Sequence, residues 1–145
     1  MFSGGHAAVI VNSNQSYAKK MKSMVNNESC SDVVFLLDND DRVYASRSLL
    51  IGQSQYFQAM FRSGMRESKE NEIHIKGCPK NVLLMFLQYL YTNEFDVCEL
   101  ADAVQLCVLA DKYQEPSLYN RCFNIVENGL SNKNVVTFLV ESDSL

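Results

Sequence analysis

The segment from Val82 to Tyr91 constrains the fold more than any other part of the chain. It is apolar or aromatic at every position except Gln88. Pro79 stands shortly before it, and proline is favoured in the first turn of a helix. A helix that is hydrophobic on nearly every side is stable only when other elements cover it. The sequence therefore predicts a buried central helix with the rest of the chain packed around it.

Apolar residues at helical spacing predict further helices on both sides of this segment. Ser16 is a plausible N-cap for the first of them, and Gly129 is expected to end the helix before the last. A short helix is also expected to begin at Leu49 and to break near Gly52. The remaining stripes cover residues 17–25, 56–61, 100–110, 118–126 and 135–140.

Three segments have the residue types and lengths of strands. Val33–Leu37 is rich in β-branched residues, and Arg42–Ser46 follows it after the turn-forming run Asp38–Asp41. Glu72–Lys76 alternates apolar and polar residues, which is typical of a half-buried strand. Strands early in the chain and helices late in it predict an α+β domain with a small mixed β-sheet.

Composition limits the classes of partner. The length of 145 residues suggests one domain. The net charge is −4, and the densest basic group, Lys19, Lys20 and Lys22, is typical of a solvated helix face, so no nucleic-acid partner is expected. The longest apolar run, Val82–Leu87, is too short to span a membrane, so no membrane association is expected.

The cysteines indicate the compartment. Their number is odd, and no pair has the C-x-x-C spacing. Free cysteines on the apolar faces of helices behave as small hydrophobic residues. We therefore expect a reducing compartment, the cytoplasm or the nucleus. The five are Cys30, Cys78, Cys98, Cys107 and Cys122.

The sequence contains no recognisable catalytic set. His6 and His74 are the two histidines, and His74 stands between two isoleucines in a predicted strand, where it points away from their face. A nucleophile needs a positioned base, and none can be argued. The glycines are dispersed and no metal-ligand spacing occurs. We therefore expect no enzyme activity, no catalytic residue, no metal and no cofactor.

Five segments, in order along the chain, resemble the BTB/POZ pattern. Two of them match it almost letter for letter: Ser54–Phe61 resembles S-x-Y-F-x-A-M-F, and Leu109–Tyr113 resembles L-A-D-K-Y. By these motifs the chain is identified as a member of the BTB/POZ family. The other three are Cys30–Phe35, Val43–Leu50 and Phe86–Thr92, which resemble S-D-V-x-F, F-x-A-H-K/R-x-x-L and F-x-x-x-L-x-Y-x-Y-T.

The resemblance implies a BTB/POZ fold, with a small mixed sheet flanked by a cluster of helices, and a role in protein assembly without catalysis. It divides the chain into a tail or extra strand at residues 1–15, the domain at 16–128, and the truncated start of a 3-box/BACK-like extension at 129–145. In some members an extra N-terminal strand, here His6–Val11, swaps onto the partner subunit. Ser46 stands where the family usually has His, so altered local hydrogen bonding is expected there.

The resemblance also implies a homodimer. Many BTB domains dimerise through the first helix and the helices after the hairpin. The stripe on the first helix either covers the chain's own core or meets a partner, and both can hold. In some members the residues at the Asp32 and Arg47 positions are buried charge partners near the seam. The implied interface comprises Tyr17, Met21, Met24, Val25, Asp32, Arg47, Leu49 and Leu50.

Met65-Arg66-Glu67 resembles the hydrophobic-x-Glu motif of BTB adaptors of cullin-3 ubiquitin ligases. Met65 is an apolar residue in an otherwise polar loop, available to enter a partner's pocket, and Glu67 can fix the orientation. The resemblance implies contacts with the N-terminal domain of cullin-3 through Phe61, Met65, Glu67 and Tyr113. Other domains of a larger protein would then choose the substrate.

Three alternatives remain open. The first is a BTB oligomerisation module of a transcription regulator or scaffold that does not bind cullin. The second is a channel-type tetramerisation domain, many of which carry a His/Cys zinc site that this chain lacks. The third is a redox or cysteine enzyme.

Overall fold

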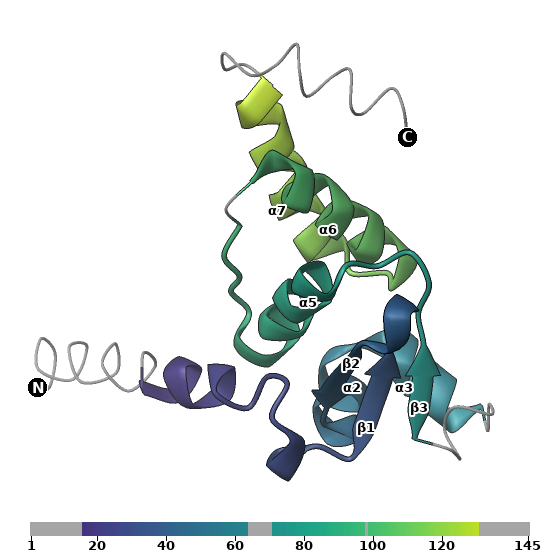
Figure 1. The fold of residues 1–145 in the computed structure, drawn as a ribbon. Helices are drawn as coiled ribbons and strands as arrows, with labels where there is room; N and C mark the ends of the chain where they lie inside the picture. Colours follow the sequence, from purple (N-terminus) through teal and green to yellow (C-terminus); the bar gives the residue numbers. More distant parts are fainter. Residues whose placement is uncertain (1–15, 64–70, 98, 131–145) are drawn as a thin grey trace, which may run out of the picture.

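The computed structural model describes residues 16–63, 71–97 and 99–130, and Figure 1 shows their arrangement. A three-stranded sheet has the order β2-β1-β3. Strand β1 (Val33–Leu36) pairs antiparallel with β2 (Arg42–Ala45) and parallel with β3 (Glu72–His74). The predicted small mixed sheet is therefore confirmed. The predicted strand at residues 6–11 and the predicted helix at 135–140 lie outside the described residues.

Buried and more exposed side chains alternate along β1 and β2, so one face of the sheet meets the core. Phe35 of β1 and Val43 of β2 pair directly and are fully buried, whereas their neighbours along the strands are partly exposed. The hairpin closes through a short 3-10 turn, Asp38–Asp40. The Asp38 carboxylate accepts a hydrogen bond from the Gly77 N–H at 2.9 Å, which ties the turn to the chain that follows β3.

Two short helices, α2 (Arg47–Gln53) and α3 (Gln55–Arg62), follow the hairpin. Each begins at a serine whose hydroxyl accepts a backbone N–H of the first turn, as an N-cap does. Ser46 accepts from Leu49 N at 3.4 Å, and Ser54 accepts from Phe57 N at 3.2 Å. Ser46 also donates its own N–H to the Tyr91 hydroxyl at 2.9 Å. Serine at this position therefore caps α2.

The central helix is α5 (Lys80–Thr92). It contacts β2 and α2 on one side and α6 (Leu100–Lys112) on another, as Figure 1 shows. Its buried residues confirm the prediction of a helix covered on most sides. They are Val82, Leu83, Phe86, Leu87, Tyr89, Leu90 and Tyr91.

The last described helix, α7 (Pro116–Leu130), packs along α6. The expectation that Gly129 ends this helix is wrong, because α7 continues through Gly129 to Leu130. A Cβ atom at Gly129 would overlap the Leu100 side chain at the start of α6. The glycine therefore lets the beginning of α6 and the end of α7 approach closely.

An aromatic cluster joins α3, α5 and the end of α6. The Tyr113 ring lies 4.9 Å from the Tyr56 ring, 4.9 Å from the Phe57 ring and 5.4 Å from the Phe86 ring, measured between centroids. Phe57 in turn meets Phe35 of β1 at 5.9 Å. The cluster therefore connects the sheet to the helices. No helix in the described ranges has both the length and the apolarity that crossing a membrane requires.

Candidate functional site

The first described helix, residues 16–22, and the turn at 23–26 that follows it present a partly open apolar stripe, so the helix ends before the end of the predicted stripe at 17–25. Met21, Met24 and Val25 pack against the core but keep part of their surface exposed, and Tyr17 is 63% exposed. The stripe therefore covers the core of its own chain and leaves apolar area for a partner. Asn26, just after this helix, holds the segment in place, because its side chain accepts the Tyr44 N–H of β2 at 2.9 Å.

Asp32 and Arg47 lie together at the start of α2. The Asp32 carboxylate accepts the backbone N–H of Arg47 at 2.7 Å, so its negative charge sits at the positive end of the helix dipole. The Arg47 guanidinium lies over the Phe61 ring at 4.4 Å and donates to Asn71 at 3.4 Å. This hydrogen bond joins Asp32 to the backbone of Arg47, and Asp32 is exposed in the single chain. That the two residues are buried charge partners near a dimer seam therefore stays a prediction.

The two leucines predicted at the dimer interface differ in depth. Leu49 is only partly buried, so part of its side chain is accessible to a partner. Leu50 is completely buried and belongs to the core of its own chain. Its contribution to an interface would therefore be indirect, through the position of α2.

A shallow depression of about 400 Å³ lies on the outer side of α3. We call the residues that line it the α3 face: Gln55, Tyr56, Ala59, Met60, Ser63 and Gln114. Of the four residues predicted to contact a cullin, Phe61 and Tyr113 are only 6% and 2% exposed. They lie beneath the surface, where the Tyr56 ring packs on Tyr113. The other two, Met65 and Glu67, lie outside the described residues.

Sequence reasoning missed the exposed members of the α3 face. Phe57 and Phe61 stand one helical turn apart and both point into the core. Ala59 therefore falls on the opposite side of the helix, where it is exposed, and Tyr56 lies between the two sides, packed against the core but partly exposed. The spacing of the two phenylalanines was the available signal.

The turn between α6 and α7 is tied to the start of α3. The Glu115 side chain and the Ser54 hydroxyl are hydrogen-bonded. Burial raises the pKa of the Glu115 carboxyl, and the hydrogen bond from Ser54 opposes that shift.

Three of the described cysteines are not activated as nucleophiles. Burial raises the pKa of the Cys78 and Cys107 thiols, and it raises the pKa of Cys122 to about 12. Thiols of this kind stay protonated near neutral pH. Within residues 16–63, 71–97 and 99–130, no three His, Cys, Asp or Glu side chains gather as a metal site would need.

Known proteins are similar to this chain in sequence. The human Kelch repeat and BTB domain-containing protein 8 is 28% identical over 128 residues, and mouse BTB/POZ domain-containing protein 6 is 35% identical over 122 residues. These matches cover 88% and 82% of this chain but only 21% and 22% of the relatives. The chain thus spans about a fifth of the length of the curated relatives that it matches.

Two solved structures share the fold. The BTB domain of zebrafish PATZ1 superimposes with a TM-score of 0.57 at 18% identity, covering 88% of this chain and 97% of that domain. The BTB domain of human gigaxonin gives a TM-score of 0.56 at 17% identity, covering 86% and 94%. The sequence profile of the BTB/POZ domain matches residues 21–130. The chain therefore belongs to the BTB/POZ domain family and is a protein–protein interaction module.

Proposed function

We propose that this chain is the dimerising BTB domain of a cullin-3 ubiquitin ligase adaptor, which acts without catalysis in the cytoplasm or nucleus. One observation carries the proposal. The α3 face ends at Ser63, two residues before Met65. Two peptide units reach at most about 7 Å. The proposal is that the cullin contact through the Met65-Arg66-Glu67 motif extends onto the α3 face.

The packing beneath the α3 face supports its use in binding. Tyr56 is partly exposed, and its buried side rests on Tyr113. An aromatic side chain held by packing loses little conformational entropy when a partner covers it. Aromatic residues are also enriched where interfaces bind most strongly. Tyr113 and Phe61 would then contribute by positioning this surface from below.

Self-association is the second part of the proposal. Tyr17 is exposed, and Met21 and Met24 are half-covered, so a partner copy would bury apolar surface that the single chain leaves open. Methionine adapts its shape readily to such a contact. In the full adaptor, a domain outside residues 1–145 would select the substrate.

A pair of alanine variants tests the α3 face. Ala59 lines this face, whereas Ala101 is another exposed alanine, on α6, that lies outside it. Binding of the fluorescently labelled N-terminal domain of cullin-3 to the full chain would be followed by anisotropy. We expect Ala59→Arg to weaken binding at least tenfold, about 1.4 kcal/mol, because the added side chain blocks the depression. Ala101→Arg should bind like the wild type.

Two outcomes would contradict the proposal. One is that the folded wild-type chain does not bind the cullin domain. This result would favour the alternative of an oligomerisation module in a transcription regulator or scaffold. The other is equal binding by Ala59→Arg and Ala101→Arg, which would move the cullin contact away from the α3 face.

A further inference from the structure

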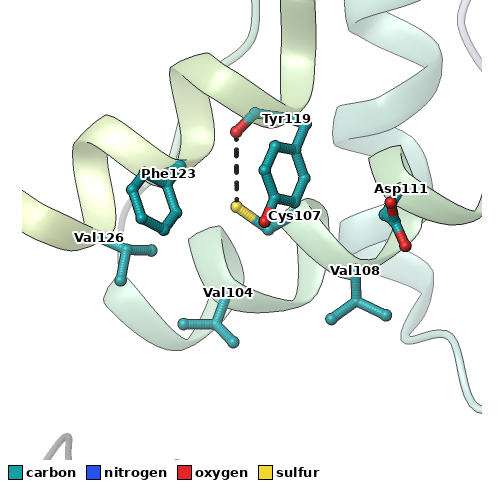
Figure 2. Close-up of a pocket in the computed structure, with 7 residues that line it drawn as sticks. All are labelled: Val104, Cys107, Val108, Asp111, Tyr119, Phe123 and Val126. Atoms are coloured by element: carbon teal, nitrogen blue, oxygen red, sulfur yellow. Dashed lines mark hydrogen bonds between the residues drawn. The ribbon is translucent and has the colours of Figure 1, made fainter. Parts of the chain in front are cut away.

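A second apolar surface lies between α6 and α7 and shares no residue with the α3 face. Figure 2 shows its side chains converging from the two helices. The groove has a volume of about 370 Å³. Besides Cys107, its lining comprises Val104, Val108, Asp111, Tyr119, Phe123 and Val126.

The exposure of this groove is unusual for the described part of the molecule. Val108 is 65% exposed, Phe123 45% and Tyr119 37%. Among the described residues, these are three of the four large hydrophobic side chains that are exposed, and all three line this one groove. Single exposed apolar residues are normal on a soluble protein, but a contiguous group marks a binding surface.

The walls of the groove are held in place before any ligand arrives. The Tyr119 and Phe123 rings stack at 6.2 Å between centroids with an angle of 13° between their planes. Cys107 donates its thiol hydrogen to the Tyr119 carbonyl oxygen at 3.7 Å, as Figure 2 shows. The two helices are also closely packed at Leu100 and Gly129. A partner would therefore bind with little rearrangement of the groove.

The charge at the groove is negative. Asp111 is the only charged residue in the lining, and the structure gives it no ion-pair partner among the described residues. The nearest cations in sequence are engaged elsewhere: Arg121 donates to the Asn93 carbonyl oxygen at 2.9 Å, and Lys112 lies 5.5 Å from the Tyr113 ring centre. An occupant that brings a positive charge would complement this surface.

We propose that this groove binds an amphipathic α-helix of a partner protein, with an apolar stripe against Val108 and Phe123 and a Lys or Arg facing Asp111. Two packed helices present a lengthwise groove into which the side-chain ridge of a third helix fits. Recognition of an amphipathic helix by such a groove is a common mode of binding. This site is separate from the α3 face, so it stands whether or not the chain binds a cullin.

Peptide selection on the full chain tests the proposal. The probe is a displayed library of helical peptides of about 15 residues, or four turns, with leucines at i, i+4 and i+7 and randomised flanking positions. We expect selection to enrich peptides with Lys or Arg beside the stripe. A synthetic enriched peptide should shift the methyl resonances of Val104, Val108 and Val126 in NMR spectra.

Variants connect that binding to the groove. Phe123→Ala should weaken the selected peptide at least tenfold, and Asp111→Lys should reverse the preference for a basic over an acidic peptide. Both side chains are exposed, so the fold should persist, as circular dichroism would check. Asn120→Ala, a change at an exposed position of α7 outside the lining, should leave binding unchanged.

Three results would overturn the proposal. The first is that no basic peptide is enriched. The second is that the selected peptides bind Phe123→Ala as tightly as they bind the wild type. The third is a set of nuclear Overhauser contacts from the Val104 or Val108 methyls to residues 131–145, or to a second copy in a mixed-label sample. These contacts would give the groove a different occupant.

Discussion

The substitution Tyr113→Ala tests whether Tyr113 is a residue of the hydrophobic core rather than one that contacts a partner directly. Its ring is 2% exposed and meets three other aromatic rings at 4.9–5.4 Å. Truncation of a buried aromatic residue to alanine costs about 3–5 kcal/mol, because the apolar contacts are lost and a cavity remains. Domains of this kind have a total free energy of unfolding of about 5–15 kcal/mol. Tyr113→Ala should therefore remove a large share of the stability.

Urea unfolding followed by circular dichroism measures this loss. With a slope near 2 kcal/mol per molar, the midpoint for Tyr113→Ala should fall by about 1.5–2.5 M. Tyr113→Phe keeps the ring and should stay within about 1 kcal/mol of the wild type. Because the proposed self-association would add to apparent stability, each curve would be repeated at a tenfold higher protein concentration. A midpoint for Tyr113→Ala within about 0.3 M of the wild type would refute the central position of Tyr113 in the core.

Three further predictions concern other parts of the fold. Gly129→Ala should lower the melting temperature because its Cβ would collide with α6, whereas Gly52→Ala, with open space around it, should raise it slightly through better helix propensity. Asp32→Asn should lower the free energy of unfolding by about 0.3–1 kcal/mol, since the charge at the Arg47 end of α2 is lost, and high salt should erase the difference. If Asp32→Asn leaves both the melting temperature and the dimer unchanged, the role given to Asp32 is wrong. The raised pKa of Glu115 means that its neutral form stabilises the fold at low pH, and that this stability is lost as pH rises through the folded pKa. Glu115→Gln should therefore gain stability over the wild type at pH 7 and lose that gain near pH 4, and a thermal-melting series across this range checks the sign.

The elements of the fold were predictable where local patterns are strong. An apolar run as long as Val82–Tyr91 leaves no solvent-facing side for a surface helix. Strict alternation at Ile73, His74 and Ile75 correctly placed the histidine outward, where it is exposed. Such patterns depend only on neighbours along the chain, so one sequence suffices to interpret them.

The depth of individual residues was less predictable. Helical periodicity identifies an apolar stripe, but it does not say whether that stripe faces the chain's own core or solvent. Val104 and Val108 both lie within residues 100–110, where an apolar helix stripe was predicted, yet both line an open groove. Gly129 was misjudged for a similar reason, since the close approach of α6 depends on contacts across the fold.

The most direct test of the proposed function is a calorimetric titration of the full chain with the N-terminal domain of cullin-3. Met65→Asp and Glu67→Lys would be measured beside the wild type, with Ala101→Arg as the control for a change at an unrelated surface. The proposal predicts saturable binding by the wild type and by Ala101→Arg, and at least a tenfold loss for each motif variant. Equal binding by all four proteins, or no heat of binding from a folded wild-type chain, would contradict it.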